Sequence, residues 1–323
     1  MGATLPIKPA LRQMSRILHV GSFTVAGRPV CAGVPGFTMR VRRHAPTVPG
    51  AGTLIQKNLK FTAIVLAGSR DGVDPVAEAA GAPCKAVVEV DGTPMVLRVL
   101  DALSRAASVD SVLVAGLPEE ALRDPVIRSG MTRHRAIPVP GSSTPSATVA
   151  QVLAGVPEGQ PVLVTTADHA LLESGIVDAF AAGADGCGAD VAIGLARAAA
   201  VFEVAPDTKR TVTRLSDGGY CGTNLFALLT PRARQAVGFW GRMERKRKNP
   251  VRMARTLGAR TLFRYLTRRL SLGDALARLS DLSGARIAPV LLPFGIAAID
   301  VDKPADLELV RRLAANPDRF SRG

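Results

Sequence analysis

Short apolar stretches alternate with polar segments along most of this chain. Phe61–Leu66 is a run of apolar, partly β-branched residues, and residues 161–167 form a second such run. Continuous apolar runs of this length are typical of parallel strands that are covered on both faces. A third run, residues 296–299, leads directly into carboxylates and also predicts a strand. Further strands are predicted at 111–115, 191–195 and 224–228.

The segments between these runs have the spacing of helices. Thr93 and Pro94 predict a helix start, after which Val96, Leu100 and Leu103 form an apolar stripe. A polar loop at residues 140–148 leads into another helix around residues 149–153. Strands that alternate with helices predict an α/β fold with a doubly wound, mostly parallel sheet.

Residues 232–269 contain thirteen Lys or Arg and one acid, Glu244. Asn249 and Pro250 predict the N-cap and first position of a helix. Leucines then recur at helical spacing, and a Ser271–Asp274 pair predicts a capping box that starts a further helix. The leucines are Leu262, Leu266 and Leu270. We expect a basic helical insertion at about residues 232–285.

This basic insertion has three open interpretations. Its charged side chains can form a solvated helical face, which needs no partner. With Trp240 beside the cluster at residues 242–248, it can also lie on an anionic membrane surface. Alternatively, it can bind an anionic substrate or nucleic acid.

The N-terminal region is also basic, with nine Lys or Arg and no acid in residues 1–60. It is rich in Gly and Pro and lacks helical periodicity, so we expect residues 1–57 to be a disordered extension of a domain at 58–323. The net charge is +14, and 47% of the 323 residues are hydrophobic, which is enough to form a substantial core. No apolar run is long enough to span a bilayer.

Charged residues gather where the predicted strands end. The first strand ends in Leu66, Ala67, Gly68 and Ser69, whose small side chains allow backbone N–H groups to approach a phosphate. Arg70 and Lys85 follow and can neutralise its charge. An ordinary strand–turn with two surface cations has the same local sequence. Asp168 ends the second run, and Asp300 and Asp302 end the third. Since ligands of open α/β sheets bind at the carboxyl ends of the strands, cations and carboxylates at one edge suit a nucleoside triphosphate with Mg²⁺.

The ordered set of motifs resembles a known family. Residues 66–70, the Pro83–Lys85 motif and residues 90–95 are similar to the opening of nucleotidyltransferases related to molybdenum cofactor guanylyltransferase, the MobA-like NTP transferases. Residues 165–168 are similar to that family's central metal-binding stretch. Residues 300–307 resemble its closing Asp-x-Asp-x-Pro-x-Asp-Leu motif. The resemblance covers about residues 60–315 and implies the nucleotide-diphospho-sugar transferase fold.

The resemblance also implies roles for individual residues. Lys85 and Arg70 would hold phosphates, while Asp168 and Asp302 would bind Mg²⁺ or Mn²⁺, with Asp300 beside them. The nucleotide would contact the loop after the first strand and the polar loop near residue 144. The residues implied for nucleotide binding are Leu66, Ala67, Gly68, Ser69, Ser143 and Thr144. Those implied for the acceptor are Arg210, Thr223 and Asn224, with Lys209 and Gly222 beside them.

The reaction implied is the transfer of a nucleotide from an NTP to an anionic, phosphorylated small molecule, with release of pyrophosphate. A glycosyltransferase of the related sugar-nucleotide fold and a membrane-surface binding protein are the alternatives. No nucleic acid partner is expected. Four widely separated cysteines without metal-ligand spacing are typical of free thiols in a reducing compartment. We therefore expect a cytoplasmic protein, with peripheral contact at the inner membrane surface through the basic insertion.

Overall fold

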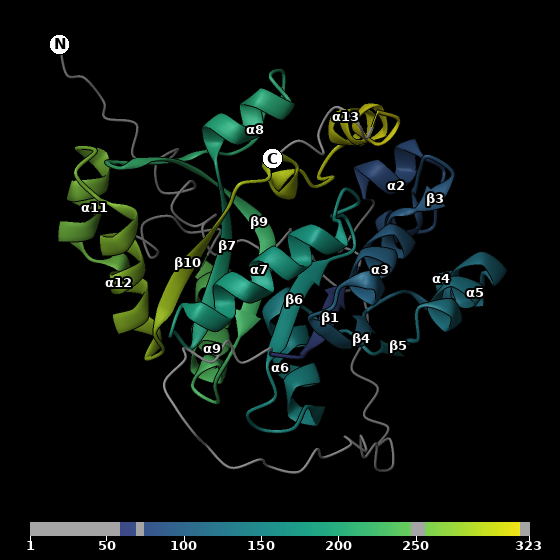
Figure 1. The fold of residues 1–323 in the computed structure, drawn as a ribbon, viewed down its shortest axis with the longest axis horizontal. Coiled ribbons are helices and arrows are strands. Elements are labelled where there is room, and N and C mark those ends of the chain that lie inside the picture. The colour runs from purple at the N-terminus through teal and green to yellow at the C-terminus, as the bar shows by residue number, and fades with distance from the viewer. Residues whose placement is uncertain (1–58, 69–73, 247–255, 317–323) are drawn as a thin grey trace, which may run out of the picture.

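A computed structural model describes residues 59–68, 74–246 and 256–316. Its centre is one twisted sheet in the order β10-β7-β9-β6-β1-β4-β5, with β8 paired to β9 (Figure 1). The strands of this sheet are β1 (Phe61–Leu66), β4 (Val109–Ala115), β5 (Ala136–Val139), β6 (Val162–Thr166), β7 (Val191–Arg197), β8 (Thr213–Leu215), β9 (Gly218–Leu228) and β10 (Ile287–Leu292). A separate antiparallel pair consists of β2 (Glu89–Val90) and β3 (Thr93–Pro94).

The sheet is mostly parallel, which confirms the predicted fold class. β1 is buried along its whole length and pairs in parallel with both β4 and β6. β9 is the exception, since it runs antiparallel to its neighbours β6 and β7. β9 is also longer than the predicted strand at residues 224–228, because its first residues form a hairpin with β8.

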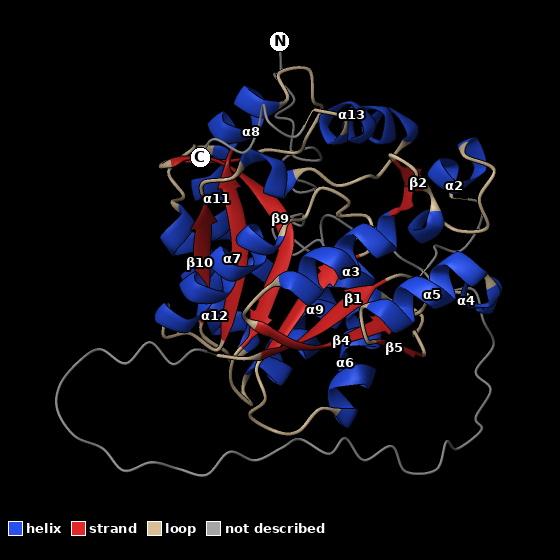
Figure 2. Ribbon diagram, turned by 45° about the vertical axis from the view of Figure 1, so that its right-hand side comes forward, coloured by secondary structure: helices blue, strands red, loops and turns tan. Residues whose placement is uncertain are grey.

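Helices cover both faces of the sheet (Figure 2). One face packs against α3 (Met95–Arg105), α5 (Pro125–Arg133) and α7 (Ser174–Gly186). The other packs against α6 (Pro145–Gly155), α9 (Ala233–Lys246), α11 (Ala259–Leu266) and α12 (Leu272–Ser283). The remaining helices are α2 (Pro75–Ala79), α4 (Glu119–Arg123), α8 (Ala198–Val204) and α13 (Pro304–Ala314), with 3₁₀ turns η1 (Lys85–Val87) and η2 (Gly295–Ala298).

The predicted strand at residues 296–299 is wrong, because these residues form the 3₁₀ turn η2. The strand lies earlier, in β10, at an edge of the sheet. An edge strand tolerates Pro289, whereas Pro293 follows the strand and favours its end. η2 packs closely on α8, since a Cβ at Gly295 would lie 2.1 Å from the carbonyl oxygen of Ala200. The turn therefore carries the closing carboxylates to the same edge that a strand would have reached.

The basic helical region is part of the sheet's covering layer. The apolar side of α9 is buried through Val237, Phe239 and Met243, and Trp240 is partly buried against the same core. The predicted capping box of α12 is present, with Ser271 and Asp274 bonded to each other's backbone N–H. The predicted helix start at residues 249–250 and the basic residues 247–248 lie outside the described residues, as does the N-terminal extension.

The predicted leucine stripe continues only in part as a helix. α11 ends at Leu266, and Leu270 is buried in the link to α12. Within the described ranges, no helix is both long and apolar enough to cross a bilayer. Cys84, Cys187 and Cys221 carry free thiols, as predicted.

Candidate active site

A buried ion pair joins Lys85 to Asp168, which follows the second predicted strand. Asp168 follows β6, and Lys85 begins η1 in the segment that leaves α2. The Lys85 ammonium donates to Asp168 Oδ2 and, over 3.0 Å, to the carbonyl oxygen of Val301. Only 5% of Lys85 is exposed and none of Asp168. Burial alone would lower the pKa of Lys85, but the surrounding carboxylates, Asp168 first, outweigh it and raise the pKa. Lys85 therefore carries its charge at neutral pH.

One carboxylate oxygen of Asp168 is left without a hydrogen bond. Asp168 Oδ1 is buried and has no partner among the described residues. A buried, unpartnered carboxylate oxygen is costly, so such an atom points to a ligand that completes it. The neighbouring His169 is also fully buried, and burial lowers its pKa to about 4. His169 is therefore neutral at pH 7 and adds no positive charge beside Asp168.

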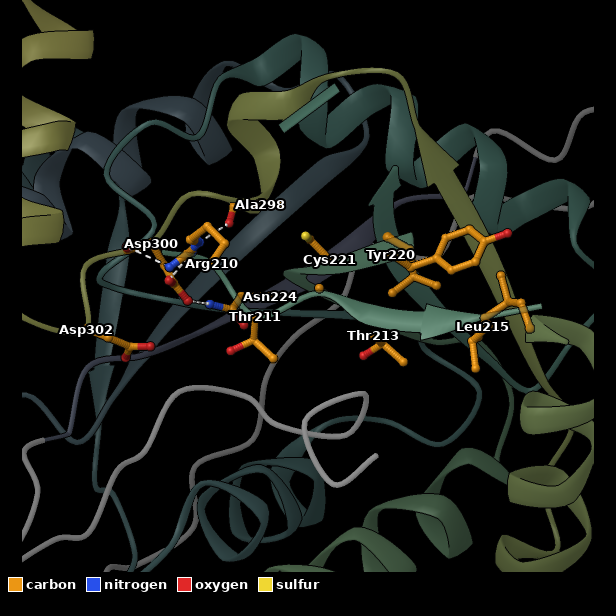
Figure 3. A pocket seen from close by; sticks show the side chains of 13 residues that line it. Arg210, Thr211, Thr213, Leu215, Tyr220, Cys221, Asn224, Ala298, Asp300 and Asp302 are labelled. Carbon is orange, nitrogen blue, oxygen red and sulfur yellow. Dashed lines mark hydrogen bonds and ion pairs between the residues drawn. The ribbon is translucent and has the colours of Figure 1, made fainter. Parts of the chain in front are cut away.

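The closing carboxylates have two different environments. Asp300 forms an ion pair with Arg210 and accepts a hydrogen bond from Asn224 Nδ2 (Figure 3). Burial would raise the pKa of Asp300, but Arg210 and Asn224 hold it below its ordinary value. Asp302 is exposed beside this group. Repulsion from Asp300, with desolvation and Asp168 adding to it, raises the pKa of Asp302 to about 6.

The residues at this edge fit Mg²⁺. Asp168 and Asp302 offer hard carboxylate oxygens, one of them unpartnered, and their mutual repulsion falls when a cation binds between them. In the part of the chain that the structure describes, no group of three acidic, His or Cys side chains is placed to hold a metal. A two-carboxylate set agrees with Mg²⁺, which commonly binds one or two carboxylates plus substrate phosphates and water. Asp300 lies beside this pair, with its oxygens engaged by Arg210 and Asn224.

The loop after β1 meets two other loops at the same edge. Gly116 has a φ of +82°, and a Cβ there would lie 3.2 Å from the Cα of Gly68 and 3.4 Å from that of Gly141. Only glycine allows this backbone conformation and approach without strain. The ends of β1, β4 and β5 thus converge, which brings the loop containing Ser143 and Thr144 to the predicted phosphate loop.

The structure changes the roles predicted for several loop residues. The N–H of Ala67 donates to the carbonyl of Ala115 over 2.9 Å, and the carbonyl of Leu66 accepts from Ala167. The sheet therefore uses these two backbone groups, and the contact of Leu66 and Ala67 with a nucleotide stays a prediction. The first N–H beyond the ladder belongs to Gly68. Ser69 and Arg70 lie outside the described residues.

The polar loop after β5 leads into the N-terminus of α6. Thr144 is the N-cap of α6, and its hydroxyl accepts from the N–H of Ala147 over 3.2 Å. Ser143 is exposed just before it. The Thr144 hydroxyl is thus engaged in capping, and Ser143 offers its side chain to solvent at the nucleotide edge. Their contact with a nucleotide remains a prediction.

A cavity of about 130 Å³ adjoins the carboxylates. Arg210, Asn224, Asp300 and Asp302 group at one end of it, and Tyr220 and Leu215 at the other (Figure 3). Two residues of the predicted acceptor set, Arg210 and Asn224, therefore line it together with Gly222. The remaining lining residues are Leu195, Thr211, Thr213, Cys221, Leu272 and Ala298.

Thr223 does not line this cavity, so the structure does not bring it together with Arg210 and Asn224 there, and its acceptor role stays a prediction. Gly222 and Asn224 line the cavity, whereas Thr223 between them does not. The Thr223 side chain is buried, and a Cβ at Gly194 would lie 2.3 Å from its hydroxyl. Lys209 is exposed beside Arg210 and is not among the lining residues.

Sequence reasoning missed the hairpin that forms the second end of the cavity. Its turn consists of Ser216 and Asp217, and Gly218 begins β9, so an Asp-Gly dipeptide, which is typical of tight hairpins, marks the turn in the sequence. That signal was available in the sequence. The contribution of Leu272 was not, because it comes from a helix more than fifty residues further along the chain.

The chain is similar to known proteins in both sequence and fold. The model of the MobA-like NTP transferase domain matches residues 63–279. A structure described as a hypothetical transferase from Thermus thermophilus is 31% identical, with a TM-score of 0.64, covering 77% of this chain and 100% of that chain. A 4-diphosphocytidyl-2C-methyl-D-erythritol synthase from Anaerococcus prevotii is 12% identical, with a TM-score of 0.50, covering 82% and 100%. Among curated proteins, none matches this sequence.

The structural likeness to the Anaerococcus synthase shows a shared fold. The family model goes further, because it spans more than half of the chain and includes β1, Lys85 and Asp168. It confirms the family indicated by the sequence motifs, although the closing motif at residues 300–307 lies beyond the matched range. The protein therefore belongs to the MobA-like NTP transferases.

Proposed function

We propose that the protein transfers a nucleoside monophosphate from an NTP to a phosphorylated small molecule and releases pyrophosphate, with Mg²⁺ or Mn²⁺ as cofactor. One observation carries this proposal. The buried Lys85–Asp168 pair, with Asp168 Oδ1 unpartnered, lies at the strand edge beside a cavity that also contains Asp302. A cation that can bind phosphate, Lys85, and two carboxylates, Asp168 and Asp302, are thus grouped beside the cavity.

In the proposed reaction, an oxygen of the acceptor phosphate attacks the α-phosphorus of the NTP. The new bond forms as the bond to the bridging oxygen breaks, and pyrophosphate leaves with that electron pair. The acceptor phosphate is already ionised at neutral pH, so no general base is required. The protein contributes by positioning the two phosphates and neutralising charge, which is where most of the acceleration of such reactions arises.

The residues divide this work. Lys85 binds the negatively charged phosphates of the NTP, while Asp168 and Asp302 bind the metal. Bound Mg²⁺ would supply charge neutralisation for the triphosphate. Arg210 and Asn224 fix Asp300, and the ion pair also orients the polar end of the cavity. Breaking the Lys85–Asp168 contact on NTP binding would free Lys85 for the phosphates.

Calorimetry with each of the four NTPs, with and without Mg²⁺, tests the binding step. We expect Mg²⁺-dependent binding of at least one NTP, strongly weakened in Lys85→Ala. Lys209→Ala is a matched control, because Lys209 is an exposed cation outside the cavity lining. Absence of Mg²⁺-dependent NTP binding would contradict the proposal. Tighter binding of a nucleoside diphosphate sugar than of any NTP would favour a glycosyltransferase.

We also infer peripheral contact with anionic membranes, through α11. Phe263 is 62% exposed on this helix, and the nearby Arg260, Arg268 and Arg269 are exposed cations. Trp240 is partly buried against the core, so α11 suits this role better than the segment around Trp240. Each cation near an anionic surface contributes roughly 1 kcal/mol, and salt screens the attraction.

Co-sedimentation with anionic and neutral vesicles tests the membrane contact. We expect salt-sensitive binding to the anionic vesicles, weakened by Phe263→Ser and by Gln at the three cations. Phe202→Ser, which changes an exposed aromatic side chain on α8, is the control. This contact would correspond to a cytoplasmic protein that attaches reversibly to the membrane. Equal sedimentation with neutral vesicles, or none at low salt, would contradict this contact.

A further inference from the structure

The cavity beside the carboxylates has two chemically different ends. Its polar end contains Arg210, Asn224 and the two closing carboxylates. Its other end is formed by Leu215, Tyr220 and Leu272, which Figure 3 shows in part as a group away from the ion pair. An acceptor that fills the cavity must match both ends at once.

The apolar end is a preformed wall. The carboxylate oxygens of Asp217 each accept the N–H of Leu272 over 3.1 Å, and the N–H of Ser216 donates to Leu270 over 2.9 Å. The β8–β9 hairpin is thus bonded to the start of α12. The Tyr220 hydroxyl donates to the carbonyl of Asp217 over 3.3 Å. Because these bonds are intramolecular, the wall needs no ligand to assemble it.

The charged residues around the cavity limit which charged groups the acceptor can have. Arg210 is the one cationic side chain among the lining residues, and it already donates to Ala298, over 2.7 Å, and to Asp300. No lining residue at the apolar end is charged. Cys221 is buried, which raises its pKa to about 11, so the thiol stays neutral. The guanidinium of Arg197 lies 5.7 Å from the centre of the Tyr220 ring but is not among the lining residues. No charged side chain therefore lines the apolar end, where desolvation of an anionic group of the acceptor would be costly.

We propose that the acceptor is a phosphomonoester with a compact, uncharged apolar group, and that Leu215, Tyr220 and Leu272 select for that group. This inference rests on the proposed nucleotidyl transfer. The phosphate lies toward Asp302 and the metal-binding carboxylates, and the apolar group lies against the hairpin and α12. The cavity of about 130 Å³ equals roughly four water volumes. Because the polar end takes up part of this volume, the apolar end encloses at most about four or five carbon atoms, and any remainder of the acceptor extends into solvent.

A series of alkyl phosphates from ethyl to octyl phosphate tests the size and chemistry of the pocket. Binding is measured by calorimetry with Mg²⁺ and a non-hydrolysable NTP analogue. Each methylene that enters the pocket should strengthen binding about fourfold, until the gain levels off at no more than about four or five carbons. Glycerol 3-phosphate should bind more weakly than butyl phosphate. A flat series, no binding of any alkyl phosphate, or tighter binding of glycerol 3-phosphate would overturn the inference.

Gly222 provides a variant that fills the pocket without disturbing the fold. It lines the cavity, and a Cβ at this position meets no atom within 4 Å. In Gly222→Ala, the gain in binding should level off at a shorter alkyl chain than in the parent protein, and in Gly222→Val at a shorter chain still. Gly186→Ala, on α7, is the matched control because its Cβ also meets open space. Leu272→Asn should flatten the series. An unchanged series in both Gly222 variants would overturn the placement of the apolar group.

Two further arms separate the possible outcomes. Dodecyl phosphate in phosphatidylcholine vesicles represents a lipid source of the same chemistry. If dodecyl phosphate in vesicles binds as tightly as hexyl phosphate, the acceptor is a lipid phosphate. If it binds more weakly, the acceptor is a soluble phosphate. NTP binding without any alkyl phosphate is measured separately. If the NTP binds and the alkyl series is flat, only the acceptor inference fails. If the alkyl series rises but no NTP binds, nucleotidyl transfer fails.

Discussion

Replacing Lys85 by Met tests whether the buried ion pair is a functional element or a stabilising one. The side chains are similar in length, but Lys85→Met leaves Asp168 buried with neither oxygen bonded to a cation. Breaking a buried pair from one side costs about 3–5 kcal/mol, because the remaining charge is uncompensated. The variant should therefore unfold at markedly lower urea concentration and lose NTP binding.

The double variant Lys85→Met with Asp168→Leu separates the two effects. Replacing both members of a buried ion pair by apolar residues is often neutral or stabilising, by about 1–4 kcal/mol relative to the charged pair. Most of the stability lost in the single variant should return. Activity should not return, since both the phosphate-binding cation and the metal-binding carboxylate are gone.

Urea denaturation followed by circular dichroism measures the free energies of unfolding, and calorimetry with Mg²⁺ and NTP measures binding. Arg105→Met is the control, because Arg105 forms an exposed pair with Asp101 on α3. Exposed pairs contribute roughly 0–1 kcal/mol, so this variant should change little. If Lys85→Met were as stable as the parent protein, or if the double variant bound Mg²⁺ and NTP normally, the reasoning would be refuted.

Three other predictions follow from the geometry. Asp168→Asn and Asp302→Asn should each lower turnover about a hundredfold or more at saturating Mg²⁺, in a pyrophosphate-release assay; near-normal turnover in either would remove that residue from the metal site. Gly116→Ala should weaken NTP binding and lower the melting temperature, because its Cβ would lie 3.2 Å from Gly68 at a φ of +82°; unchanged binding would mean that the loops do not need this contact. Burial alone would raise the pKa of Asp190, but hydrogen bonds hold this pKa below the ordinary 3.8. The ionised Asp190 side chain therefore stabilises the fold at neutral pH, and this contribution is lost as pH falls through the pKa of the folded state. The difference in unfolding free energy between the parent and Asp190→Asn should therefore shrink below about pH 4, and a difference that grows in acid would contradict this sign.

Apolar runs determined the central strands of the fold. β1, β4, β6 and β7 lie where their runs predicted them, because a strand covered on both faces must be apolar along its length. The direction of β9 was not predicted. Apolar periodicity does not encode strand direction, and the antiparallel pairing depends on the β8–β9 hairpin that precedes it.

The strand-end rule also determined part of the candidate site. Asp168 lies just beyond β6, as the rule predicts, and Lys85 in η1 and Asp302 after η2 lie near it. The rule worked for Asp302 even though the predicted strand before it is a 3₁₀ turn. It did not predict that Asp300 pairs with Arg210, because these residues meet only when η2 packs beside the segment before β8.

The sequence by itself determined the fold class, the family motifs and the charges available at the sheet edge, since all of these depend on local runs and spacing. Only the tertiary structure decided which groups meet. It left Asp168 Oδ1 unpartnered, turned Thr223 away from the cavity, and brought Leu272 of α12 against the β8–β9 hairpin. The physical reason is that such contacts join residues far apart in the chain. Their formation depends on how helices and strands pack, which no local pattern specifies.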